Sequence, residues 1–169
     1  MGPPQKQLIS TLLATASAAL LFLLLPFVVG WISDQYKLDE QQAGLIVSIY
    51  FGGFLITSVA AYITYGKVRN LAAIQLGYIL LVTGLVVCGL APNTIFLSIS
   101  LALCGIGSGL LYGTGVSIVS AHPQSERAFG GMVATQQIIA LALIYSLPVW
   151  IYPYYGYAAC WLVLAVIVA

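Results

Sequence analysis

The chain has 169 residues, of which 62% are hydrophobic and only 5% are charged, and its mean hydropathy is +1.06. Soluble domains carry about 25% charged residues, so this chain cannot cover a water-facing surface. We therefore expect an integral membrane protein with very little mass outside the lipid bilayer. The net charge of +1 implies no long-range attraction to nucleic acid, and no nucleic-acid partner is expected.

The three cysteines, Cys88, Cys104 and Cys160, all lie within apolar runs. Their number is odd, and buried cysteines commonly behave as small hydrophobic side chains. We expect them to form neither a disulfide framework nor a metal site, and the sequence indicates no cofactor.

Charged residues and turn residues divide the sequence into six apolar segments, each a candidate spanning helix of about 20 residues. The segments lie at about residues 8–32, 43–65, 71–91, 94–120, 128–150 and 157–169, and together they predict one domain over residues 1–169. The first is longer than the apolar region of a cleaved signal peptide, so we expect a retained helix. Pro26 predicts a kink in it.

The connections between these segments are short and contain turn residues or charges. The sequence predicts a polar loop over residues 33–42, a basic turn over 66–70, a tight turn at Pro92-Asn93 and an aromatic turn over 152–156. In the remaining loop, residues 121–127, Ser125 is expected to cap the following helix.

A stripe of small residues runs along the uncharged segment 94–120. Gly105, Gly109 and Gly113 recur at every fourth residue, so they share one face of a helix. In membranes such stripes let helix backbones approach closely, whereas a soluble helix would lose about 1 kcal/mol per glycine. This segment is therefore predicted to be a membrane helix at the centre of a tight bundle.

The distribution of basic residues predicts the orientation of the helices. Lys6, Lys67, Arg69 and Arg127 fall on one side of the six segments, and only Lys37 falls on the other. By the positive-inside rule, the N-terminus is expected in the cytoplasm. The opposite side carries the aromatic residues of an interface belt: Trp31, Tyr36, Trp150, Tyr152, Tyr154, Tyr155 and Tyr157.

The spacing of the segments indicates an internal repeat. A shift of 86 residues places segments 1–3 onto segments 4–6, and Gly44 then meets Gly130. Three helices are an odd number, so the two copies must point in opposite directions, an arrangement that recurs in transporters with a binding site near the bilayer middle. The same shift would end the last helix near position 177, so the chain is expected to stop about eight residues early.

Several short motifs resemble those of the major facilitator superfamily of transporters. They are Gly105-x-Gly107-x-Gly109 followed by Pro123-x-x-Glu126-Arg127, Gln42-Ala43-Gly44-Leu45, and Tyr155-Gly156-Tyr157. The resemblance covers essentially the whole chain and implies an all-α membrane protein with six transmembrane helices. These would form two inverted three-helix repeats, the N-terminal half of a twelve-helix fold truncated within its sixth helix.

The sequence also departs from that family's pattern. Leu101 stands where the family often has an arginine, and Tyr65-Gly66-Lys67-Val68-Arg69 lacks the aspartate of the family's 2–3 loop. The glycine-proline signature late in the fifth helix is reduced to Pro148. These departures argue against drug/proton antiport and against the usual gating lock in that loop.

The chemistry of the predicted spans argues against catalysis. They contain no ionisable Asp, Glu, Lys, Arg or His, which argues against proton coupling through these helices and against a charged substrate held by ion pairing. Ser108 and the single histidine, His122, would lie about 21 Å apart along a helix, whereas a nucleophile and its base need about 3 Å. We therefore predict that the chain is not an enzyme.

The candidate substrate-binding residues are polar side chains near mid-membrane: Ser17, Ser108, Tyr112, Gln136 and Gln137. For Ser108 the favoured alternative is a small packing residue that bonds its own backbone, and Tyr112 can also serve in core packing. Gln136 and Gln137 differ by about 100° on a helix, so one can join helices while the other faces an aqueous cavity. Lys67 and Arg69 are interpreted as topology anchors, or alternatively as gating residues.

The leading hypothesis is a transporter of major-facilitator type in the plasma (inner) membrane that moves a small organic solute by alternating access. Its partners would be the lipid bilayer, the solute, and a missing C-terminal six-helix half or a second copy of the chain. The alternatives are a membrane interaction protein that does not transport, and an inactive truncated product with the same fold.

Overall fold

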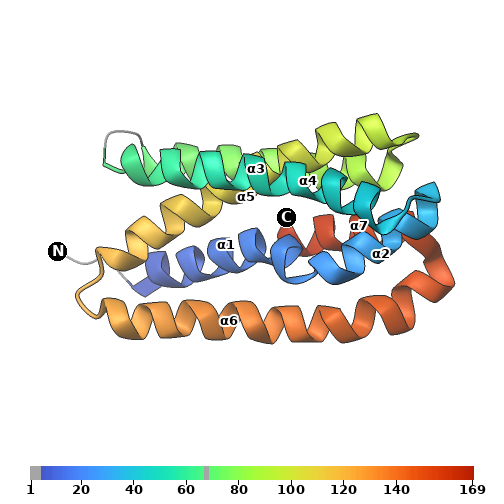
Figure 1. Cartoon of the computed structure of the whole chain (residues 1–169). Coiled ribbons are helices and arrows are strands. Elements are labelled where there is room, and N and C mark those ends of the chain that lie inside the picture. Colours follow the sequence, from blue (N-terminus) through green and yellow to red (C-terminus); the bar gives the residue numbers. More distant parts are fainter. Residues whose placement is uncertain (1–4, 67–68) are drawn as a thin grey trace.

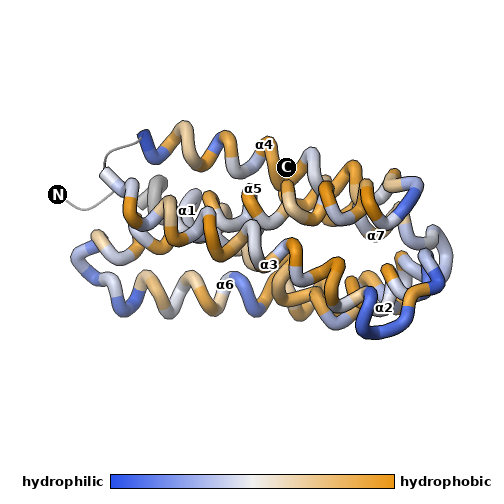
Figure 2. Tube along the Cα trace, turned by 45° about the horizontal axis from the view of Figure 1, so that its top comes forward, coloured by the Kyte–Doolittle hydropathy of each residue, from blue (hydrophilic) through white to orange (hydrophobic). Residues whose placement is uncertain are grey.

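A computed structural model describes residues 5–66 and 69–169, with side chains from residue 9 onward. The described residues are helical, and no strand occurs among them. The elements are α1 (Gln5–Leu23), α2 (Leu25–Tyr36), α3 (Glu40–Ile63), α4 (Asn70–Leu90), α5 (Thr94–Ser120), α6 (Ser125–Ser146), the π-helix η1 (Leu147–Ile151) and α7 (Tyr152–Val168) (Figure 1). Polar residues gather at the ends of the bundle and apolar residues along its length (Figure 2), as a bilayer requires.

Four helical stretches are long and apolar enough to cross a membrane, or five if the bent pair α1–α2 counts as one span. One of the four runs for 44 residues from Ser125 to Val168. At 1.5 Å per residue such a stretch would be roughly twice as long as the hydrocarbon core is thick. The chain reverses direction within it, since α7 runs back toward the middle of the bundle beside α4 (Figure 1).

The first predicted segment, residues 8–32, is not one kinked helix but two helices bent by 49°. The break lies at Leu24, two residues before the proline that predicted a kink. Pro26 has no N–H to donate to the Phe22 carbonyl and disfavours helical geometry at the residue before it, so the disturbance begins upstream of the ring.

The predicted polar loop over residues 33–42 is much shorter in the structure. Helix α2 continues to Tyr36, and Lys37 ends it in a left-handed conformation, with φ 55°. Helix α3 begins at Glu40, because Asp39 forms a capping box with Gln42: the Gln42 N–H donates to Asp39 at 2.7 Å and the Asp39 N–H donates to Gln42 at 3.3 Å. The sequence reading missed this capping box.

The predicted turns on both sides of α6 also differ from the structure. Ser125 is the first residue of α6 and not its cap; Gln124 holds the cap position without a side-chain hydrogen bond. At the other end, the predicted aromatic turn over residues 152–156 is mostly helical. Pro148 lies in η1, and the non-helical residue is Gly156, with φ 75° and ψ −170°, a conformation that glycine tolerates.

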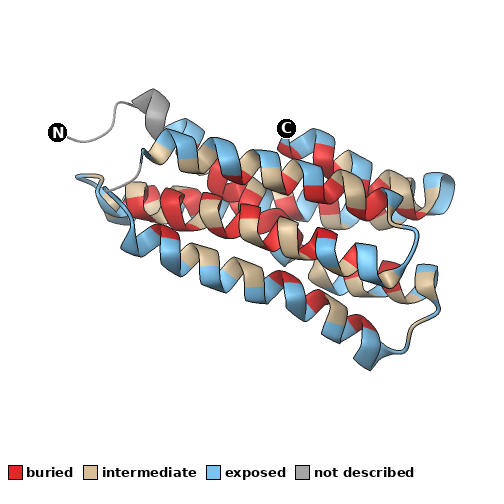
Figure 3. Ribbon diagram, turned by 90° about the horizontal axis from the view of Figure 1, so that it is seen from above, coloured by how far each residue is buried: buried red, intermediate tan, exposed pale blue. Residues whose placement is uncertain are grey.

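Helix α5 is the central helix of the bundle. Half of an apolar 18-residue stretch of α5 is buried, against 17–28% of the corresponding stretches in the other three long apolar segments. It packs most extensively on α3 and α4, and it also contacts α1 and α6. Seen from above, the buried residues gather along the middle of the bundle (Figure 3).

The glycine stripe of α5 lies directly against α3. A Cβ at Gly109 would meet the Phe54 carbonyl oxygen at 2.5 Å as well as the Thr57 hydroxyl, and one at Gly113 would meet the Ser58 carbonyl oxygen at 2.5 Å. A Cβ at Gly105 would collide with the Tyr50 carbonyl oxygen. The Thr57 hydroxyl also donates to the Ile106 carbonyl at 3.1 Å, a hydrogen bond that the close approach makes possible.

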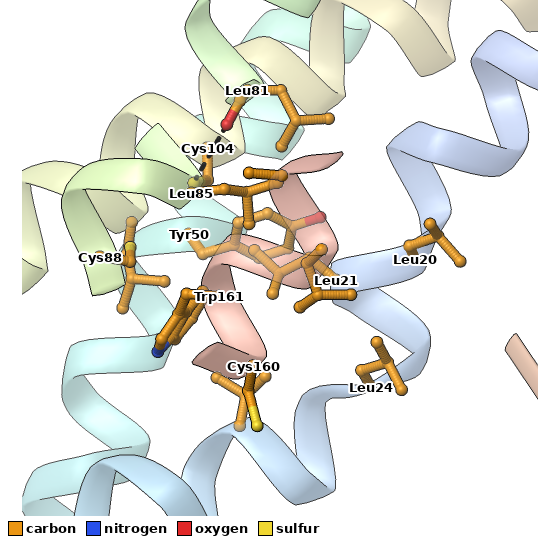
Figure 4. Packing of buried hydrophobic residues seen from close by; sticks show 14 of the residues in the cluster. Leu20, Leu21, Leu24, Tyr50, Leu81, Leu85, Cys88, Cys104, Cys160 and Trp161 are labelled. Carbon is orange, nitrogen blue, oxygen red and sulfur yellow. Dashed lines mark hydrogen bonds between the residues drawn. The ribbon is translucent and has the colours of Figure 1, made fainter. Parts of the chain in front are cut away.

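The hydrophobic core lies between α1, α2, α3, α4, α5 and α7, and Tyr50, Leu85 and Trp161 are fully buried in it (Figure 4). All three cysteines are buried and free, and each packs among apolar side chains. Among the described residues no group of histidine, cysteine, aspartate or glutamate could hold a metal ion.

Candidate functional site

A hollow of about 300 Å³ opens between α1, α3, α5 and α6, at the C-terminal end of α1 and near the middle of α3 and α6. Volumes of this order are typical of the smaller sites for organic ligands. Its lining residues are Ala19, Phe22, Leu23, Phe54, Tyr112, Val133, Gln136 and Gln137. The four helices thus bring together three of the five polar residues that the sequence singled out, and we refer to this site as the hollow.

Aromatic rings form much of the wall of the hollow. The Phe54 and Tyr112 rings have centroids 5.6 Å apart and planes inclined by 51°. The fully buried Tyr50 ring stacks on Phe54, at 6.1 Å and 29°, which fixes the Phe54 ring in place. Phe22 of α1 completes the aromatic wall and is 49% exposed.

The two adjacent glutamines of α6 have different environments. Gln136 is buried, and its Nε2 donates to the Thr15 carbonyl of α1 at 3.4 Å. Gln137 is exposed and forms no hydrogen bond within the described part of the chain. One amide therefore joins two helices, while the other is free to bond a solute.

No charged side chain lines the hollow among the described residues. The sequence contains no Asp, Glu, Lys, Arg or His over residues 41–66, 70–121 and 128–169, which include every lining residue outside α1. The hollow can therefore offer aromatic faces, a phenol and amides, but neither ion pairing nor acid–base chemistry.

The remaining predicted site residues lie away from the hollow. Ser108 is fully buried; its hydroxyl faces the Tyr50 phenol without hydrogen-bond geometry, and it does not line the hollow. Ser17 is half-buried and also outside the lining set. Arg69 is exposed just before α4, and Lys67 lies outside the described residues.

Sequence reasoning missed Phe22 and Phe54 as lining residues. Both lie in uniformly apolar segments, where neighbouring side chains give no sign of which face meets lipid and which meets a cavity. The signal available was positional, since both lie near the middle of their segments, as do Tyr112 and Gln136.

At one end of the bundle, polar and aromatic contacts join α2 to α7 and to Ala91, which directly follows α4. The Tyr36 phenol donates to the Ala91 carbonyl at 2.7 Å, and the Tyr152 phenol donates to Asp34 at 3.2 Å. The Trp31 and Tyr152 rings are stacked, with centroids 5.8 Å apart. Trp31, Tyr36 and Tyr152 belong to the predicted aromatic belt, and we call this end of the bundle the aromatic end. The opposite end, which carries Arg69 and Arg127, is the basic end.

Comparison with known proteins finds relatives over part of the chain. The rubrofusarin-specific efflux pump aurT of Gibberella zeae is 31% identical over 95 residues, which cover 53% of this chain and 18% of the pump. The MFS-type efflux pump elcC of Phaeosphaeria nodorum is 33% identical over 86 residues, covering 47% and 15%. The efflux pump aflT of Aspergillus parasiticus is 27% identical over 125 residues, covering 70% and 23%.

The matched stretches thus span less than a quarter of the length of each of these relatives. No protein-family model matches the chain, and no solved structure does.

Proposed function

Because the chain is a relative of efflux pumps of the major facilitator superfamily, we propose that it forms part of a membrane transporter that exports a small organic solute by alternating access. The direction follows from the names of the relatives, which are efflux pumps. The observation that supports this function most strongly is the hollow, an uncharged site with polar groups that opens between four apolar helices. No catalytic function is proposed.

In this proposal the hollow is the chain's share of the solute pathway. Gln137 and Tyr112 contact the solute, and Gln136 lines the site while its bond to Thr15 holds α6 against α1. Ser108 and Ser17 are left out of the binding set, because neither lines the hollow.

We further propose six spans in two inverted three-helix repeats, α1/α2–α3–α4 and α5–α6–α7. The pairing of helices supports this arrangement: α5 packs on α3, and α1 packs on α6. A two-fold exchange of the two repeats converts the first pair into the second. The basic end would face the cytoplasm of a plasma-membrane protein, and Arg69 would act there as a topology anchor.

The pathway is proposed to be completed by a second six-helix unit, either a C-terminal half or a second copy. The hollow is open on one side, and the exposed face of α6 beside it is apolar, with Ile138 and Leu141 each 70% exposed. A second unit, or lipid, would cover this face. One six-helix unit supplies one wall of an alternating-access pathway.

Solute accumulation in inside-out vesicles tests the proposed function. Inside-out vesicles that contain the protein are given a panel of uncharged, cationic and anionic organic compounds, and accumulation is compared with vesicles that lack it. We expect at least one compound to accumulate, and Phe54→Leu and Gln137→Leu to reduce its rate. The matched variants Phe96→Leu and Gln75→Leu, at exposed positions outside the hollow, should leave the rate unchanged. No accumulation of any compound would contradict transport by this chain or by copies of it that assemble in the vesicle membrane.

A further inference from the structure

From the geometry of the hollow we infer the chemical class of its solute: an uncharged, flat aromatic compound that carries a hydrogen-bond acceptor such as a ring carbonyl. The inference rests on the proposed function and specifies which solutes the same site selects. It depends on three properties of the lining residues, namely the position of the rings, the unpaired amide and the absence of charge.

The rings provide a wall for a flat solute. The Phe54 ring stacks on the buried Tyr50 ring and contacts the Tyr112 ring at a tilt of 51°, and both Phe54 and Tyr112 line the hollow. Phe22 reaches the same space from α1. Aromatic rings gain about 0.5–1.5 kcal/mol beyond burial when they meet another ring in offset or edge geometry, so this wall favours a ring over an aliphatic chain of equal area.

The amide of Gln137 favours an acceptor on that ring. It is the exposed member of the glutamine pair, and its NH₂ group offers two donors without a partner among the described residues. The Gln136 NH₂ group is already occupied by the Thr15 carbonyl. A carbonyl on the solute would accept a hydrogen bond from one of these donors.

The absence of charge excludes the alternative of a cationic aromatic solute. Aromatic faces attract cations, but a cation that leaves water for this hollow would find no carboxylate to replace its hydration. The same argument holds for an anion, since no lysine or arginine lines the hollow among the described residues. An uncharged solute can enter the hollow without losing the hydration of a charged group.

Four probes of similar size separate these properties. Fluorenone is flat, uncharged and aromatic and has a carbonyl, and fluorene has the same aromatic rings without the carbonyl. N-methylacridinium is flat and permanently cationic. Dicyclohexyl ketone has the carbonyl but no aromatic ring. Saturable binding of each is measured on the chain in lipid nanodiscs, with empty nanodiscs to subtract partition into lipid. We expect fluorenone to bind most tightly, fluorene about five- to tenfold more weakly, which is the value of one neutral hydrogen bond, and the other two more weakly still.

Substitutions in the hollow then assign each preference to its residue. Gln137→Leu should weaken fluorenone about five- to tenfold and leave fluorene unchanged, whereas Tyr112→Leu and Phe54→Leu should weaken both. The matched controls Gln75→Leu and Tyr145→Leu, both at exposed positions outside the hollow, should alter neither. The isosteric Gln137→Glu keeps the shape of the site, and its carboxylate should reverse the order by making N-methylacridinium bind more tightly than fluorenone. Helix content and elution volume in detergent verify that each variant is folded.

Equal binding of fluorenone and fluorene, tightest binding of the cation or the aliphatic ketone by the unsubstituted chain, or no saturable binding at all would each overturn the inference. The first two outcomes leave transport of another solute class intact, and the vesicle assay would detect it. Loss of both binding and accumulation for every compound would overturn the proposed function as well.

Discussion

Gln136 of α6 donates a hydrogen bond from its Nε2 to the Thr15 carbonyl of α1, at 3.4 Å and across 121 residues of sequence. The bond joins the two helices that flank the hollow on one side. The next residue, Gln137, is exposed to the hollow and forms no such bond within the described part of the chain. This contrast separates an amide that joins two helices from the one proposed to bind the solute, and it leads to the first prediction.

Gln136→Leu is expected to lower the free energy of unfolding by about 0.5–1 kcal/mol, because interhelical hydrogen bonds in membranes contribute about that much. Gln137→Leu should leave it unchanged within about 0.5 kcal/mol and should weaken solute binding. Denaturant titration in mixed micelles measures the first effect and nanodisc binding the second. Equal destabilisation by both variants would show that the glutamines share one role.

Gly109→Ala should destabilise the fold by about 1–3 kcal/mol, since its methyl group would meet the Phe54 carbonyl oxygen at 2.5 Å and the Thr57 hydroxyl. The matched control is Gly130→Ala on α6, where an added Cβ has no neighbour within 4 Å. We expect that variant to be neutral or stabilised by up to about 1 kcal/mol through better helix propensity. The same micelle titration compares them, and a tolerated Gly109→Ala would mean that α5 does not pack on α3 as closely as described.

Tyr36→Phe removes the hydrogen bond to the Ala91 carbonyl at the aromatic end. The loss leaves that carbonyl without this donor and should cost about 0.5–1.5 kcal/mol. Faster hydrogen exchange at the end of α2 is the expected sign, because this bond ties α2 to the end of α4. Tyr154→Phe, at a side chain that is 79% exposed, serves as the control and should exchange like the unsubstituted chain.

Solute binding in the hollow is expected to be independent of pH between about 5.5 and 8. Its described lining contains no aspartate, glutamate, histidine, lysine or arginine side chain. Fluorenone binding measured at both pH values should agree within about twofold. A clear pH dependence would reveal a titrating group in the site.

The proposed orientation places the basic end in the cytoplasm. A cysteine at Tyr154 should therefore react with an impermeant thiol reagent from outside intact cells, and a cysteine at Arg69 only after permeabilisation. The native cysteines are buried and should not interfere. The reverse pattern would invert the topology.

The sequence was sufficient for the features that depend on composition and helical geometry. Membrane character followed from the scarcity of charge, and the opposed environments of Gln136 and Gln137 followed from the rotation of 100° per residue. A disturbance in the first segment followed from Pro26, although the helix breaks at Leu24 because a proline acts on the residues before it.

The lining aromatics and the helix ends could not be read in the same way. Phe22 and Phe54 lie in apolar segments without a polar face, so only tertiary packing shows which side chains turn inward. Ser108 was a candidate because of its mid-membrane position, but the close approach of α3 to the glycine stripe buries it completely. The Asp39 capping box was present in the sequence and overlooked.

Protection of a cysteine inside the hollow by a solute tests the central claim most directly. Val133→Cys lines the hollow, and Ile138→Cys lies on α6 outside the lining set, where Ile138 is 70% exposed. Both variants in nanodiscs are labelled with a thiol reagent, with and without saturating fluorenone. We predict that fluorenone slows labelling at Val133→Cys by at least fivefold and leaves Ile138→Cys unchanged. Equal labelling rates at Val133→Cys with and without fluorenone would contradict binding in the hollow.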